Sequence, residues 1–105
     1  MKVITKAEIK RLPPLGATEN QGDNAVAQVH WFSSSWDWWA TEFDPETGEL
    51  FGFVHGFEDE WGYFSIAEFE EIMKERPLEL IQKGIERDAN WRPRTIAEIK
   101  KEIRR

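Results

Sequence analysis

The sequence predicts an α+β fold, in which a small antiparallel β-sheet is packed by two or three helices. Residues 25–64 have the alternation and the aromatic content of about four strands, arranged as a meander. Capping-box patterns followed by apolar residues at helical spacing occur after that segment. With 105 residues and no cysteine, we expect a single domain, residues 1–105, whose core forms without disulfides.

The N-terminal segment predicts a short helix and a loop. Thr5 is a typical N-cap residue for a helix over residues 5–12. Prolines 13 and 14 end this helix, because neither ring donates a backbone hydrogen bond. Residues 15–24 have turn composition and predict a connecting loop.

The central strands are predicted over residues 25–32, 36–43, 50–57 and 61–64. Residues 44–48 predict the turn between the second and third strands. In that turn Asp caps through its side chain, Pro presets φ, and Gly accepts a positive φ. The acidic residues 58–60 are expected to form a polar tip before the fourth strand.

The first helix after the sheet is predicted over residues 66–76. Ser65 and Glu68 form a capping box, in which a hydroxyl and a carboxylate each accept from an otherwise unpaired amide. Pro77 ends the helix. Residues 78–81 can add one more helical turn.

The C-terminal segment predicts one more helix and a weak strand. Residues 84–91 are compatible with a fifth strand. Thr95 and Glu98 form a second capping box, which opens a helix over residues 95–105. The basic residues at its end suit the negative end of the helix dipole.

The charges are unevenly distributed along the chain. The formal net charge is −6, yet residues 12–73 contain thirteen Asp and Glu and no Lys or Arg. All fourteen Lys and Arg lie in the two ends, with the other seven acids. A negative field attracts basic partners and repels phosphate backbones. The alternative interpretation is that the acids only solvate a protein face.

The aromatic residues have two interpretations. They are Trp31, Trp36, Trp38, Trp39, Phe43, Phe51, Phe53 and Phe57. Most are expected in the core of the sheet, with one or two left as anchors for a partner. Proteins that bind single-stranded nucleic acid interleave such rings with Lys or Arg. The aromatic segment has neither, so direct nucleic-acid binding is disfavoured except through the basic C-terminal helix.

Two histidines suggest a weak chemical site. Simple strand registers place His30 and His55 opposite Trp38, with Glu42 nearby, as a metal or acid–base pair would require. Two His without a third convergent ligand are more often structural or exposed. The sequence has no phosphate loop, nucleophile elbow or metal motif. We therefore expect no enzymatic activity, no cofactor and no metal.

The expected partner-binding residues are acids on turns and strand ends, together with two indoles. They are Glu42, Asp44, Glu46, Glu49, Glu58, Asp59, Glu60, Trp36 and Trp38. Such carboxylates can imitate a row of phosphates in the basic groove of a nucleic-acid enzyme. The sequence leaves open whether these acids form one patch or only provide solubility.

Three strings carry a resemblance that covers nearly the whole chain. They are LPPLGATE (12–19), WDWWATEFDPETGELFGFVHGFEDEWGYFS (36–65) and GIERD (84–88). They resemble an uncharacterised domain family carried by plasmids, conjugative elements and phages. That family implies no reaction and no catalytic residues. Small acidic proteins of such elements include anti-CRISPR inhibitors, and the chain is similar to type II-A anti-CRISPR proteins, which implies inhibition of Cas9.

The expected function is accordingly that of an anti-defence protein encoded by a mobile element. It would bind Cas9 or its guide complex through an acidic surface and block nucleic-acid binding or cleavage. The alternative is a nucleic-acid-binding accessory protein of plasmid conjugation or replication. The chain has no apolar run of transmembrane length. We expect the cytoplasm of a bacterial host, and the oligomeric state is open.

Overall fold

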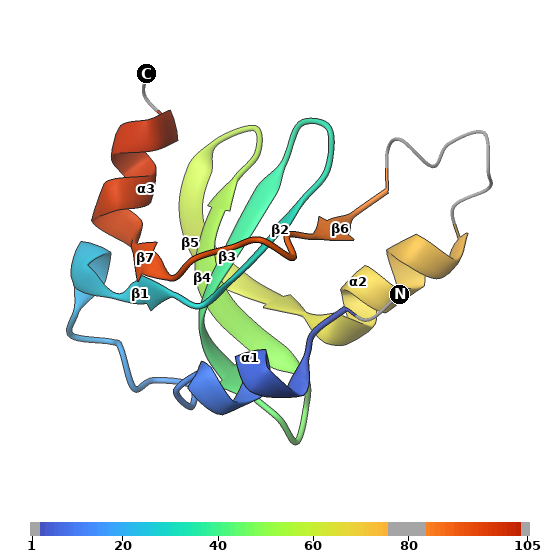
Figure 1. Cartoon of the computed structure of the whole chain (residues 1–105), viewed down its shortest axis with the longest axis horizontal. Coiled ribbons are helices and arrows are strands. Elements are labelled where there is room, and N and C mark those ends of the chain that lie inside the picture. Colours follow the sequence, from blue (N-terminus) through green and yellow to red (C-terminus); the bar gives the residue numbers. More distant parts are fainter. Residues whose placement is uncertain (1–2, 76–83, 104–105) are drawn as a thin grey trace.

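The computed structural model describes residues 3–75 and 84–103 (Figure 1). In chain order the elements are α1 (Lys6–Arg11), the 3-10 helix η1 (Gly22–Asn24), β1 (Val26–Ala27), β2 (Val29–Phe32), β3 (Asp37–Asp44), β4 (Glu49–His55), β5 (Asp59–Ser65), α2 (Ile66–Glu75), β6 (Glu86–Arg87), β7 (Arg94–Thr95) and α3 (Ile96–Ile103). The predicted α+β fold is confirmed. No helix within the described ranges is long and apolar enough to cross a membrane.

The main sheet has five strands in the order β5-β4-β3-β2-β6, and all its described pairs are antiparallel. The predicted meander corresponds to β2–β5. The fifth strand exists, but it comprises only Glu86–Arg87 instead of residues 84–91. It pairs with β2 at the edge of the sheet.

The segment predicted as one strand over residues 25–32 is divided into β1 and β2. Gln28 separates them, although its N–H still donates to the Ala40 carbonyl at 2.9 Å. Strand β1 pairs outside the main sheet with β7, which the sequence did not predict. This second, two-stranded ladder lies beside α3 (Figure 1).

The turns and helix caps follow the predicted local signals. In the β3–β4 turn Gly48 has a φ of 80°, and the Asp44 carboxylate accepts from the Glu46 N–H at 2.9 Å. Capping boxes precede α1, α2 and α3. The predicted helical turn at 78–81 lies outside the described residues, as do residues 76 and 104–105 of the predicted helices.

The second hairpin differs from its prediction. Strand β4 ends at His55 instead of residue 57, and β5 begins at Asp59. The connection is therefore residues 56–58, and two of the three acids predicted at the tip belong to the strand.

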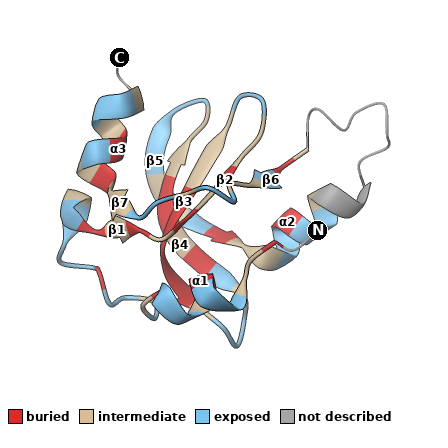
Figure 2. Ribbon diagram, in the orientation of Figure 1, coloured by how far each residue is buried: buried red, intermediate tan, exposed pale blue. Residues whose placement is uncertain are grey.

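Buried side chains lie on both faces of the sheet, and Figure 2 shows the buried residues concentrated along the central strands. On one face Trp31 is fully buried against Phe69 of α2 and Phe64 of β5. On the other face, Ile96 and Ile99 of α3 cover Trp39 and Phe53. Half of the predicted aromatic group is therefore buried, namely Trp31, Trp39, Phe43 and Phe53, and the helices leave the upper ends of the hairpins uncovered (Figure 1).

Candidate protein-binding surface

The carboxylates predicted to bind a partner divide between the two ends of strand β4 (Figure 1). The first group, here called the turn acids, is Asp44, Glu46 and Glu49 at the β3–β4 turn. The second group, the tip acids, is Glu58, Asp59 and Glu60 at the β4–β5 hairpin. Because seven residues of an extended strand span about 20 Å, the two groups are well separated. They do not form one patch.

The turn acids are partly engaged in local structure. Asp44 is half-buried and accepts the hydrogen bond that caps the turn. Glu46 and Glu49 are exposed. Among the described residues, the strongly exposed large hydrophobic side chains are Phe57 and Tyr63, neither of which lies in this turn. The turn acids are therefore solvated charges without an apolar anchor in the turn.

Glu42 does not meet solvent, so its prediction as a surface acid is wrong. A β-bulge shifts the register between Ala40 and Glu42, and Glu42 is only 3% exposed. Its carboxylate accepts hydrogen bonds from the Gly16 N–H at 2.7 Å, the Thr18 N–H at 2.8 Å and the Thr18 hydroxyl. Glu42 thus fixes the 16–18 loop against the sheet. A bulge of one residue reverses the face that simple alternation assigns.

At the other end of β4, rings and carboxylates lie together. We call the six residues there the tip surface: Trp36, Trp38, Phe57, Glu58, Asp59 and Glu60. The Phe57 side chain is 94% exposed. Its ring meets Trp36 edge-on at 5.3 Å between centroids, and Trp36 stacks on Trp38 at 5.8 Å. The β2–β3 and β4–β5 connections thereby form one continuous aromatic ridge.

Gly56 is required for this arrangement. A Cβ atom added at Gly56 would lie 2.3 Å from the Trp36 ring, well inside van der Waals contact. The indole therefore rests directly on the backbone of the β4–β5 connection. This packing fixes the base of the ridge while Phe57 projects beyond it.

The tip acids follow the exposed ring directly in the chain, at the same hairpin. All three are exposed, and Asp59 contacts the ring Nδ1 of His55. Asp37 lies directly across from His55 on β3, but its carboxylate is bound by His30. The chain has no Lys or Arg between residues 12 and 73, so this end of the sheet combines an apolar anchor with negative charge.

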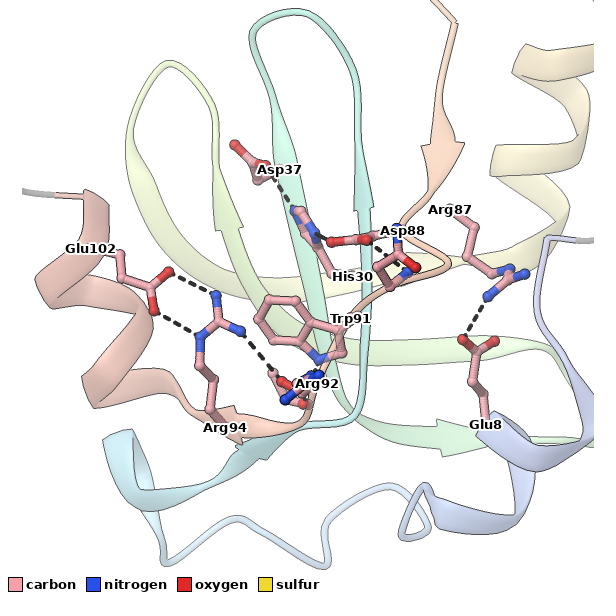
Figure 3. Close-up of polar contacts among 11 residues, drawn as sticks. Glu8, His30, Asp37, Arg87, Asp88, Trp91, Arg92, Arg94 and Glu102 are labelled. Carbon is pink, nitrogen blue, oxygen red and sulfur yellow. Dashed lines mark hydrogen bonds and ion pairs between the residues drawn. The ribbon is translucent and has the colours of Figure 1, made fainter.

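A separate polar cluster surrounds His30 on the α3 side of the sheet (Figure 3). Its Nδ1 lies 2.9 Å from the Asp88 carboxylate and its Nε2 lies 2.8 Å from that of Asp37. The ring stacks on Trp39 at 5.1 Å with an interplanar angle of 9°. Asp88 comes from the GIERD string, which the sequence reasoning did not connect with His30.

The segment after Asp88 is held by further contacts around this cluster. Trp91 donates from its indole to the Ala27 carbonyl at 2.9 Å. Arg94 stacks over Trp91 at 4.0 Å and binds both oxygens of Glu102 at 2.8 and 2.7 Å (Figure 3). An open cavity of about 490 Å³ lies among these side chains. His30 and Arg94 are each bound by carboxylates there, which is typical of a structural clamp, and the exposed Arg92 also lines the cavity.

The predicted histidine pair is not formed as expected. His30 pairs with Trp39, and His55 pairs with Asp37, so neither lies opposite Trp38. Each histidine has its own carboxylate partners, and Glu42 is used by the 16–18 loop. Within residues 3–75 and 84–103, no group of three or more His, Asp or Glu could hold a metal ion.

Several basic side chains of the two ends are neutralised within the fold. Arg87 pairs with Glu8 at 2.9 Å, and Lys100 pairs with Asp23 at 2.9 Å. Arg94 is bound by Glu102, as described above. These contacts lower the positive charge that the ends present to a phosphate backbone.

Comparisons with protein-family models, with curated proteins and with solved structures found no match. The case for a function therefore rests on the geometry of the chain itself.

Proposed function

We propose that this chain is an anti-defence protein encoded by a mobile element, an anti-CRISPR inhibitor that binds Cas9 or its guide complex. It acts without catalysis, in the cytoplasm of a bacterial host. The tip surface makes the contact and blocks nucleic-acid binding or cleavage. The observation that carries this proposal is the exposed Phe57 ring among the tip acids.

The chemistry of the tip surface fits a basic protein partner. Aromatic side chains at the centre of an interface contribute much of its binding energy when a pocket of the partner covers them. Carboxylates around such an anchor accelerate encounter with a basic groove and exclude acidic partners. Cas9 holds its guide and target in a positively charged channel. A ring flanked by carboxylates complements an entrance to that channel.

The surroundings of His30 and Glu42 support a structural role for these two side chains. His30 lies between two carboxylates, and Glu42 holds a loop. A general base needs an open position beside the proton that it removes. The competing hypothesis, a nucleic-acid-binding accessory protein, is weakened because three basic side chains are already paired with carboxylates.

Cas9 cleavage and complex formation, measured with purified protein, test the proposal. The double variant Glu58→Gln/Glu60→Gln should associate more slowly with the Cas9–guide complex, and its association rate should depend less on salt concentration. The matched control is Glu46→Gln/Glu49→Gln, which removes the same charge at the far end of β4 and should behave as the wild type.

Two outcomes would count against this function. Absence of binding and inhibition across several type II effectors would reject the inhibitor role. Equal loss in both double variants would show that net charge matters and that the tip surface does not. A mobility shift of single-stranded DNA that weakens with added salt would instead favour the accessory-protein hypothesis.

A further inference from the structure

A second cavity, of about 440 Å³, lies between the β4–β5 pair and the 16–22 loop. Three aromatic rings line it, from Phe51, Trp61 and Tyr63, together with the carboxylates of Glu19 and Glu42. No Lys or Arg is among the lining residues. The cavity is separate from the tip surface and from the cluster around His30.

The three rings form an angled aromatic wall. Phe51 lies opposite Tyr63 in the β4–β5 register, and Trp61 lies two residues earlier on the same strand face. Phe51 and Trp61 are nearly parallel, with centroids 5.7 Å apart and an interplanar angle of 13°. Tyr63 is tilted by 58° to Phe51 at 4.9 Å and is 66% exposed at the rim. Ring faces carry negative electrostatic potential.

The loop side of the cavity adds a buried negative group. The Glu42 carboxylate accepts three hydrogen bonds from the 16–18 loop. These donors solvate it, but none of the ion pairs found among the described residues includes Glu42. Glu19 is exposed on the same side of the cavity. Charge on a buried group acts through a lower dielectric than charge on the surface, so it attracts a cation more strongly.

We propose that this cavity binds an organic cation, either a methylated ammonium or a guanidinium. Such a group has apolar surface for the rings and positive charge for the ring faces and carboxylates. A hard metal ion would need six to eight oxygen ligands, and the cavity supplies two carboxylates with one already hydrogen-bonded. A phosphate-bearing ligand would meet two carboxylates and no basic side chain among the lining residues.

The cation has two sources that share this chemistry: a free solute, or the end of a lysine or arginine side chain of another protein. The site does not depend on the proposed contact with Cas9. The Phe57→Ala variant should therefore bind the cation as the wild type does, and loss of Cas9 inhibition would leave this inference standing.

Binding can be measured with tetramethylammonium chloride by following the Trp61 indole N–H signal in NMR spectra at constant ionic strength. The Trp61→Phe variant identifies that signal among the six indoles. A saturable shift is expected with tetramethylammonium, and a much weaker response with neopentyl alcohol, which has a similar shape and no charge. Equal responses to the two probes would overturn the inference.

Substitutions of exposed residues that line the cavity test the proposed cation site without disturbing the core. Tyr63→Leu should lower the affinity about tenfold, and Tyr63→Phe, which keeps the ring, should change it less than about twofold. Glu19→Gln should weaken binding, whereas Glu46→Gln, outside the cavity, should not. An unchanged affinity in Tyr63→Leu would also overturn the inference.

Short peptides separate the two sources. A peptide with one trimethyllysine and a peptide with one arginine are compared with tetramethylammonium. Tighter binding of either peptide supports a protein side chain as ligand, and equal binding supports a free solute. Failure of all three probes to bind the folded protein contradicts the site.

Discussion

The two ends of strand β4 carry similar acids in different settings. At the β3–β4 end Asp44 caps its turn, and the neighbouring Glu42 is buried and holds a loop. At the β4–β5 end the acids are exposed and lie in the same hairpin as Phe57, which is 94% exposed. Equal formal charge therefore serves different roles: Asp44 and Glu42 at one end stabilise the fold, whereas the exposed Glu46 and Glu49 beside them have no apolar neighbour comparable to the ring at the other end. The exposed ring, more than the count of acids, distinguishes the two.

The largest effect is expected from removing the buried acid. Glu42→Ala leaves two backbone N–H groups and the Thr18 hydroxyl without their acceptor. Since each buried donor without a partner costs about 1–3 kcal/mol, we expect the free energy of unfolding to fall by about 3 kcal/mol. Urea unfolding measures this loss. Glu46→Ala, an exposed control, should change stability by less than about 0.5 kcal/mol. If Glu42→Ala had a similarly small effect, the Glu42 carboxylate would not stabilise the fold.

At the tip we expect a large effect on partner binding and a small effect on stability. Phe57→Ala should weaken binding to the Cas9–guide complex by about 2 kcal/mol, roughly thirtyfold, as for an anchor residue of an interface. Its stability should stay within about 0.5 kcal/mol of the wild type, because the side chain is almost fully exposed. Calorimetric titration and urea unfolding give the two values. Tyr63→Ala removes the other strongly exposed ring and should leave Cas9 affinity unchanged. A loss of affinity in both variants would mean that Cas9 binding depends on exposed hydrophobic surface in general and not on Phe57 in particular.

A smaller effect is expected where the ridge rests on the backbone. Gly56→Ala puts a Cβ atom 2.3 Å from the Trp36 ring, so the indole must move. We expect stability to fall by about 1 kcal/mol, as in overpacked sites, with a partial loss of Cas9 affinity. Gly62→Ala is the control, because its Cβ would have no neighbour within 4 Å. Identical unfolding curves for the two variants would show that Trp36 is not held by this contact.

Local signals in the sequence predicted the parts of the fold that depend on neighbouring residues. The Asp44–Gly48 turn, the Thr5 N-cap and the two predicted capping boxes formed as expected, because each depends on residues within four positions. Alternation also identified the strands of the meander. The division between core and exposed rings was predicted in outline, but Phe57 was not among the expected partner-binding residues.

What the sequence could not predict depends on distant contacts. The burial of Glu42 results from a bulge and from a loop 24 residues away. The pairing of β1 with β7 and the contact of His30 with Asp88 join segments separated by 58 residues or more. Hydrophobic periodicity contains no information on which distant segment completes such a contact. Candidate site residues chosen from charge alone therefore mixed structural acids with exposed ones.

Glu98, in the first turn of α3, represents a third class of carboxylate: it is exposed, yet it stabilises the fold as part of a helix cap. The hydrogen bond from the Thr95 backbone N–H, followed by that from its hydroxyl, lowers the pKa of Glu98 below its ordinary value of 4.5. A lowered folded-state pKa gives stability that is present above the unfolded value and is lost as pH falls through the folded value. The stability of the wild type relative to Glu98→Gln should therefore decrease on acidification below about pH 4.5. Urea unfolding of both proteins across that range measures the difference, which should be smaller in a Thr95→Ala background. A difference that increases towards acid would mean that the cap favours the protonated form, opposite to the geometry at Thr95.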